Sequence, residues 1–387
     1  MDGFRWIGFG LVAVAVATGG AGAGCGDDGG AGAADVVQDS GILVGGQDAV
    51  AGDTAVAQDT AVAQDTAAAQ DTAVAQDTAV AQDTAVAQDT AVAQDTSSPG
   101  PPPVVAPGCV DGQYDEALPD DAGAISQLVS GYSQADYKAF IDQVLAVRYP
   151  IGQYLVAHGV SEYPQQDCVE YFAQGYTSTA KKLIGGLSTV THECGHFLDG
   201  ARGTFGGNTY VFRPDLAITC DGGDARDRFG NTFARSEITK DEYDALFPND
   251  FYKDTYLVQV GSDQGFNMVA EEAVQYINSL ATDWAFRDNI GNGFSITARD
   301  GILTFLWYIE RYLRYARLHD AAAHEFLLGT PCWRRVILTI WGRAWLYLDL
   351  SDGISSLGID DDALLDLVLD PVLLDEVEHV RDAEGCP

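Results

Sequence analysis

The sequence predicts a mainly α domain of the α+β class, with a small β element, behind a long N-terminal stretch of different composition. Most of the 16 Phe, 17 Tyr and 6 Trp in the 387 residues lie after residue 108, which is enough apolar material for a packed core. Apolar residues recur there at spacings of three and four, and strand-like stretches are scarce. We therefore expect a leader at 1–25, a disordered acidic spacer at 26–108 and a folded domain at 109–387.

The leader is typical of a signal peptide. Arg5 is followed by the apolar run "WIGFGLVAVAVAT" and then by the small residues "GGAGAGC". The run is shorter than the roughly 20 apolar residues that a membrane-spanning helix needs. Its end resembles a bacterial lipoprotein signal with Cys25 as the lipidated residue, although Gly22 stands where such signals usually have Leu. A lipoprotein signal and a plain secretory signal both predict an extracytoplasmic protein. The lipoprotein signal adds an anchor in a bacterial membrane, on the periplasmic side or at the cell surface.

The spacer contains seven hexapeptide repeats at 55–96, six of them "AVAQDT" and one "AAAQDT". Their only apolar side chains are Ala and Val, which bury too little surface to offset the entropy of the chain. We expect a flexible spacer that holds the domain away from the membrane. The alternative, a small β-helix of stacked hexapeptides, would require larger inward-facing aliphatic residues.

Helical periodicity dominates the folded part. Four long stretches have helical spacing: 134–156, 267–286, 301–319 and 332–350. Two shorter stretches are expected to be strands: "TYVFRPDLAIT" at 209–219 and "TYLVQV" at 255–260. The stretch at 301–319 contains too many Arg and Glu residues for a membrane span.

Charge excludes some partners. The formal net charge is -36, and residues 1–108 contain 14 Asp and one Arg, so 43 acidic and 20 basic residues remain for the folded part. Such a surplus repels phosphate backbones and anionic lipid surfaces, so we expect no nucleic-acid partner and no membrane contact except through the N-terminal anchor. The oligomeric state is left open.

The cysteines predict disulfides. If Cys25 carries lipid, six cysteines remain, and an even number outside the cytoplasm favours up to three disulfides among 15 possible pairings. Cys109 and Cys386 bracket the folded part, which suits a bond between its ends. Cys194 is expected in the core or in a disulfide, with Cys220 as a possible partner.

The stretch "TVTHECGHFL" at 189–198 carries the clearest chemical signal. On a helix, His192 and His196 lie one turn apart on one face with Glu193 beside them, and Val190 and Phe197 lie on the opposite face. Two such imidazoles can bind one Zn²⁺, and the glutamate can then act as a general base. Two further predictions concern this helix: another segment or a substrate passes close to Gly195, and Asp199 orients an imidazole.

These residues also carry a family resemblance. "THECGHFLD" resembles the active-site helix of zincin metallopeptidases, and "HECGHFLD" is similar to the text of the lethal-factor-like branch. The resemblance implies a zincin-like domain at 109–387 and an exported zinc metallopeptidase that hydrolyses peptide bonds with a metal-activated water, Glu193 being the general base. It also implies a peptide or protein as the substrate.

In the wider gluzincin group, the third metal ligand is a glutamate on a later helix. The matching stretch is "NMVAEEAVQYINSLA", which offers Glu271 and Glu272. The apolar centre of this predicted helix lies nearer to Glu272, so we prefer Glu272 and keep Glu271 as the alternative.

A peptidase also needs a hydrogen-bond donor for the oxyanion, and Tyr256 is our candidate, ahead of Tyr252, His319 and His324. Two other hypotheses stand beside the enzyme. One is a non-catalytic binding or scaffold lipoprotein at the cell surface that keeps a zincin-like fold. The other is a helical interaction module in which the two histidines and the glutamate fall together by chance.

Overall fold

The computed structural model describes residues 104–204, 206–259, 261–289 and 297–387, and within them the protein is mainly helical with one small sheet. The predicted secondary-structure content is therefore confirmed. The leader, Cys25 and the hexapeptide repeats lie outside the described residues. Of the predicted spacer, residues 104–108 are described. There the carbonyl of Val104 accepts a hydrogen bond of 2.6 Å from Nε1 of Trp341.

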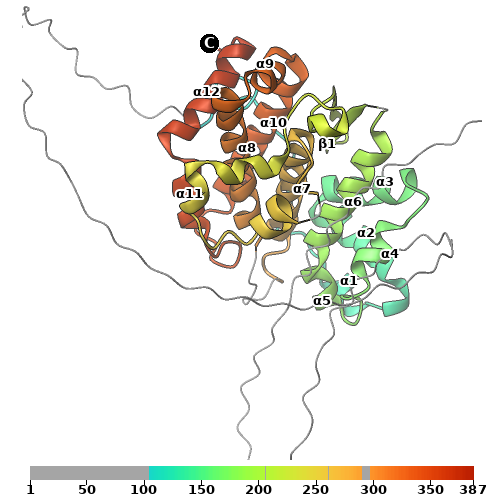
Figure 1. Cartoon of the computed structure of the whole chain (residues 1–387). Coiled ribbons are helices and arrows are strands. Elements are labelled where there is room, and N and C mark those ends of the chain that lie inside the picture. Colours follow the sequence, from blue (N-terminus) through green and yellow to red (C-terminus); the bar gives the residue numbers. More distant parts are fainter. Residues whose placement is uncertain (1–103, 205, 260, 290–296) are drawn as a thin grey trace, which may run out of the picture. The chain divides into compact units, whose positions relative to one another are not determined.

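The first helices form the part of the molecule coloured cyan to green in Figure 1. In chain order they are α1 (Ser126–Ser130), the 3-10 turn η1 (Gln134–Asp136), α2 (Tyr137–Arg148), α3 (Pro150–Glu162), α4 (Cys168–Ala173), α5 (Ala180–Gly185) and α6 (Leu187–Arg202). The predicted helical stretch 134–156 is thus interrupted at Tyr149. Proline disfavours the helical conformation in the preceding residue, and Tyr149 has φ −142° and ψ 78°. Pro150 then starts α3, where its missing N–H is no loss.

The sheet is a single antiparallel hairpin of β1 (Gly207–Arg213) and β2 (Leu216–Asp221), with Tyr210 opposite Ile218. It confirms the β prediction for 209–219. The strand predicted at 255–260 is wrong as far as it is described, because Asp254–Val258 form a turn of π-helix, η5. The adjacent side chains of Tyr256 and Leu257 are both buried, whereas a strand would place them on opposite faces.

Short 3-10 turns connect the hairpin to the next long helix. They are η2 (Arg226–Arg228), η3 (Arg235–Lys240) and η4 (Glu242–Ala245), which precede η5. The later helices are α7 (Phe266–Ala285), α8 (Ala298–His319), α9 (Ala321–Gly329), α10 (Pro331–Leu350), α11 (Asp361–Val368) and α12 (Pro371–Glu384). The helices predicted at 267–286, 301–319 and 332–350 correspond to α7, α8 and α10. None of the helices in the described ranges is long and apolar enough to cross a membrane.

Helix α7 is central to the arrangement. It packs against α6 on one side and against α8 and α10 on another, and in Figure 1 it lies between the green and the orange helices. Nearly all its residues are buried, including polar ones such as Gln275 and Asn278. A helix buried on all sides must place its polar residues against partners on its neighbours, and this requirement builds the site described below.

Three disulfides link distant parts of the chain. They join Cys109 to Cys386, Cys168 to Cys194 and Cys220 to Cys332. The predicted bond between the ends of the folded part is confirmed. The partner suggested for Cys194 is wrong. Cys194 bonds to Cys168 because α4 packs against α6, while Cys220 on β2 bonds to Cys332 on α10.

Candidate metal centre

Helix α6 is covered by helices on two sides, with α3 on one and α7 on the other. Gly159 permits the close approach of α3, because a Cβ at this position would lie 2.4 Å from the carbonyl oxygen of Cys194. The face that carries His192 and Glu193 is buried too, with exposed fractions of 7 % and 5 %. The two histidines therefore lie between helices rather than on an open surface.

Contacts between α6 and α7 show that the two helices are antiparallel. Nδ1 of His192 lies 3.2 Å from Oγ of Ser279, and Nδ1 of His196 lies 3.0 Å from Oε1 of Glu271. Residues later in α6 therefore face residues earlier in α7. This pairing brings the glutamates at the start of α7 next to the second histidine.

Gly195 lies at the closest approach of the two helices. A Cβ at Gly195 would stand 1.9 Å from Oε1 of Gln275, so the prediction that another segment passes close by is confirmed. Nε2 of Gln275 donates to Oδ2 of Asp199 at 2.8 Å, and the backbone N–H of Val211 donates to Oδ1 at 2.8 Å. Asp199 therefore ties α6 to α7 and β1. The prediction that Asp199 orients an imidazole is wrong, because its carboxylate accepts hydrogen bonds from Gln275 and Val211 instead.

His192, His196 and Glu272 form a group that could hold a metal ion, since one ligand atom from each lies within 4.8 Å of the others. The two Nε2 atoms are 3.1 Å apart, and each lies 3.5 Å from Oε2 of Glu272. Ligand atoms on a tetrahedral zinc with bonds of 2.0–2.1 Å stand about 3.3 Å apart, so the spacing fits such an ion. Oε2 of Glu272 is buried without a hydrogen-bond partner, as expected for a ligand atom.

A second layer of contacts orients the imidazoles. Glu271 bonds to the Nδ1 atom of His196, and Ser279 bonds to the Nδ1 atom of His192. Oγ of Ser279 also donates to the carbonyl of Ser188 at 3.4 Å. Both Nε2 atoms are thereby turned toward Glu272, which is the usual arrangement around metal-binding histidines. Of the two predicted glutamates, Glu272 belongs to the group that could hold a metal ion, and Glu271 bonds to His196.

The charges of this group are strongly coupled. Burial lowers the pKa of His196, but the carboxylates of Glu272 and Glu271 outweigh this effect and raise it well above its usual value. Burial raises the pKa of Glu272, yet His196 and His192 hold it far below its usual range. Without a metal, a protonated imidazole therefore balances the carboxylates, and a bound cation would replace that proton.

Glu193 lies beside the ligands on α6 and is buried. Burial raises the pKa of its carboxyl group, while His192 and His196 act in the opposite direction. A carboxylate with a raised pKa is a stronger base than an exposed glutamate, which suits proton transfer. The side chain of His196 is 13 % exposed, so the centre is not sealed from solvent.

Tyr256, the predicted oxyanion donor, is linked to His192 through a second tyrosine, Tyr276. Its hydroxyl lies 3.0 Å from that of Tyr276, whose ring packs edge-on against His192 with 4.7 Å between centroids. Burial raises the pKa of both tyrosines well above the usual value, so both hydroxyls keep their protons. Tyr252 instead donates to the carbonyl of Thr297 at 3.1 Å.

The sequence reasoning missed Tyr276 and Ser279 as site residues. They follow Glu272 at four and seven positions along α7, so all three share one face of the helix. This spacing was visible in the sequence and could have identified them. Gln275 also follows Glu272 by three positions, but its contact with α6 depends on the close approach at Gly195, which the spacing does not reveal.

The comparisons with known proteins give no match: the chain fits no protein-family model, no curated protein and no solved structure. The likeness to zincins thus concerns the residues of α6 and α7 and the order in which they occur.

Proposed function

We propose that this chain is an exported zinc-dependent metallopeptidase. The observation that carries the proposal is the convergence of Nε2 of His192, Nε2 of His196 and Oε2 of Glu272, which has no hydrogen-bond partner, with Glu193 beside them. Two imidazoles and one carboxylate are a usual protein ligand set for catalytic zinc, which leaves a coordination position for a reactant.

The chain's own residues divide the remaining chemistry. Zinc, when bound, supplies a Lewis acid that polarises the scissile carbonyl and lowers the pKa of water. Glu193 takes a proton from the attacking water and delivers it to the amine leaving group. The hydroxyl of Tyr256 or Tyr276 donates a hydrogen bond to the developing oxyanion. Glu271 and Ser279 keep the imidazoles oriented.

Location outside the cytoplasm is part of the proposal. Three disulfides within the described part of the chain are typical of an oxidising compartment. The leader, with Cys25 as the site of lipid attachment, would tether the domain to a bacterial membrane through the spacer. A peptide or protein outside the cytoplasm is then the expected substrate.

The first experiment measures zinc per mole of purified protein. We expect close to one zinc in the wild type and almost none in His196→Ala or Glu272→Ala. Glu271→Gln is the matched control on the neighbouring position of α7. It should keep the metal with an affinity that is about 10- to 100-fold weaker, because it removes only the support of His196. Loss of zinc from Glu271→Gln with retention in Glu272→Ala would reverse the two roles.

The second experiment tests catalysis with Glu193→Gln. This variant should keep its zinc and lose hydrolysis of a peptide library by roughly 10²- to 10⁴-fold, since it lacks the general base. Full activity in Glu193→Gln would contradict the mechanism. Zinc binding by a wild-type protein that cleaves no peptide would favour a non-catalytic surface protein with a zincin-like site.

A further inference from the structure

Arg235, at the start of η3, is a buried arginine without a counter-ion. Only 2 % of the residue is exposed. Its Nε and Nη1 atoms have no hydrogen-bond partner, and no carboxylate of the described residues lies within ion-pair distance of its guanidinium group. The backbone N–H of Arg235 donates to the carbonyl of Gln264 at 2.7 Å, so the main chain is held while the side chain is not.

This arrangement is energetically unfavourable for a merely structural residue. A charge taken out of water without a partner destabilises the folded protein, and buried arginines are normally paired. Burial lowers the pKa of Arg235, and the largest opposing influence is the carboxylate of Glu272. The guanidinium thus lies within electrostatic reach of the metal centre without being neutralised by a direct contact there.

Ring contacts link Arg235 to the candidate centre through Tyr256 and Tyr276. Its guanidinium carbon lies 5.2 Å from the centroid of the Tyr256 ring, a cation–π contact. Tyr256 is hydrogen-bonded to Tyr276, and Tyr276 packs on His192. A continuous set of side chains therefore leads from Arg235 to the ligands.

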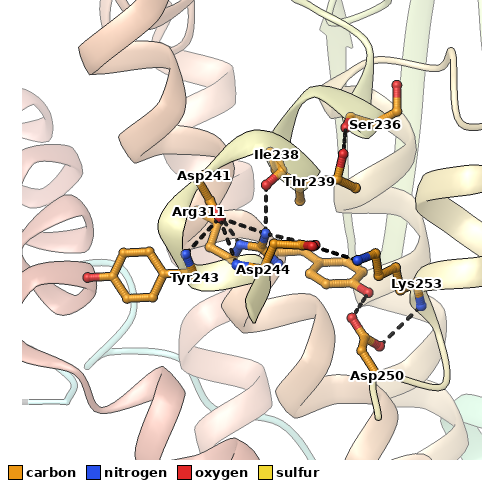
Figure 2. A network of polar contacts seen from close by, with 10 residues as sticks. Ser236, Ile238, Thr239, Asp241, Tyr243, Asp244, Asp250, Lys253 and Arg311 are labelled. Carbon is orange, nitrogen blue, oxygen red and sulfur yellow. Dashed lines mark hydrogen bonds and ion pairs between the residues drawn. The ribbon is translucent and has the colours of Figure 1, made fainter. Parts of the chain in front are cut away.

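A network of polar contacts holds the segment that carries Arg235 (Figure 2). Arg311 on α8 donates to Oδ1 of Asp241 at 2.8 Å and to the carbonyl of Ile238 at 2.6 Å, which fixes η3 and the start of η4. Lys253, next to η5, pairs with Asp244 at 2.5 Å. Because η5 contains Tyr256, this network positions both the backbone of η3 and the Tyr256 ring against which the guanidinium of Arg235 packs.

We propose that Arg235 binds a carboxylate group of the substrate beside the metal centre. This proposal rests on the proposed function. The N–H groups on Nε and Nη1 are buried without an acceptor, and a guanidinium binds a planar carboxylate better than any other side chain does. The substrate carboxylate would supply the counter-ion that the fold withholds, in a site with low dielectric where the interaction is strong.

The carboxylate could come from the C-terminus of a peptide or from an acidic side chain, and two pairs of probes distinguish these sources. All are malonyl hydroxamates, in which the hydroxamate binds zinc without reducing the disulfides as a thiol would. The first pair carries glycine or glycinamide. The second carries aspartic acid amide or asparagine amide. Binding to the zinc-loaded protein is measured by calorimetry.

In the wild type, the acid of at least one pair should bind about 10- to 100-fold more tightly than its amide, the range expected for a charge-assisted hydrogen bond. In Arg235→Gln this ratio should fall to about 1, and Arg235→Lys should retain part of it. Arg228→Gln is the control: it removes the same charge from an exposed arginine that pairs with Asp263, and it should keep the wild-type ratio.

Several results would overturn the proposal. One is a zinc-loaded wild type that binds the acid and the amide of both pairs equally, or binds no hydroxamate; the metal centre itself would still stand. Another is an unchanged ratio in Arg235→Gln. A marked fall in thermal stability of Arg235→Gln would assign the guanidinium a structural role instead. A protein that binds no zinc would overturn both the proposed function and this role of Arg235.

Discussion

Arg343 and Arg235 are both buried, yet the fold treats their guanidinium groups differently. Arg343 on α10 donates to Oε2 of Glu116 at 3.0 Å, to Oδ1 of Asn278 at 2.7 Å and to the hydroxyl of Tyr149 at 3.1 Å. Glu116 also accepts from the hydroxyls of Tyr114 and Tyr347. Arg235 has no comparable contact.

The difference separates a cluster in which the buried charge is fully paired from one in which polar atoms lack hydrogen bonds. Around Arg343 the surrounding chain supplies the partners of the buried charge. Around the candidate centre, Oε2 of Glu272 and two nitrogens of Arg235 are buried without a hydrogen bond. Both clusters include a residue of α7, Asn278 in one case and Glu272 in the other. Both arginines are buried, so the contrast does not arise from different degrees of burial.

The largest expected effect comes from breaking the satisfied cluster. Glu116→Gln leaves the charge of Arg343 without its counter-ion, and we expect the free energy of unfolding to fall by about 3 to 5 kcal/mol in chemical denaturation. Zinc content of the folded protein should not change. The double variant Glu116→Leu with Arg343→Met should recover much of the loss. A neutral effect of Glu116→Gln would remove the distinction between the clusters.

A somewhat smaller effect on the free energy of unfolding should come from adding zinc to the candidate centre. At a free zinc concentration about 100 times the dissociation constant, binding should raise the free energy of unfolding by about 2.7 kcal/mol. A chelator should reverse the gain. The same addition should have no effect on His196→Ala. An equal gain in that variant would show that zinc binds elsewhere.

The close contact between α6 and α7 allows a matched test of packing. Gly195→Ala places a methyl group against Gln275, and we expect a loss of about 1 to 3 kcal/mol together with weaker zinc binding. Gly200→Ala, on the same helix, meets no atom within 4 Å and should be neutral or stabilising. Equal effects of the two substitutions would mean that the close packing of α6 on α7 at Gly195 does not contribute to stability.

The smallest effect concerns Asp283, another carboxyl group on α7. Burial raises its pKa to about 7, against a hydrogen bond with Ser188 that lowers it. The folded state therefore holds this proton more tightly than the unfolded state. The resulting stability is present at low pH and is lost as the pH rises from about 4 through 7.

Asp283→Asn removes this dependence. Near pH 4 the variant and the wild type should unfold with nearly the same free energy. At pH 8 the variant should be more stable by about 1 to 2 kcal/mol, less than a fully enclosed carboxyl would give, because Asp283 keeps some exposure. Parallel stability curves for the two proteins between pH 4 and 8 would contradict the assignment.

Much of the secondary structure could be predicted because it depends on local pattern. The spacing of apolar residues indicated α7, α8 and α10, and the hairpin was signalled by its β-branched residues between glycine and aspartate. The errors occurred where packing overrode propensity. The stretch containing Tyr256 and Leu257 reads as a strand, but both side chains are buried and the chain forms a helical turn.

The sequence by itself determined the chemistry of the candidate centre, because two histidines and a glutamate within five residues must share one side of a helix. Only the tertiary structure decided between Glu271 and Glu272. Neighbours on a helix point about 100° apart, and the antiparallel packing of α7 on α6 directs one to the ligand group and the other to His196. It also decided the disulfide partners and packed Arg235 against the ring of Tyr256. These are contacts between distant segments, which local periodicity does not encode.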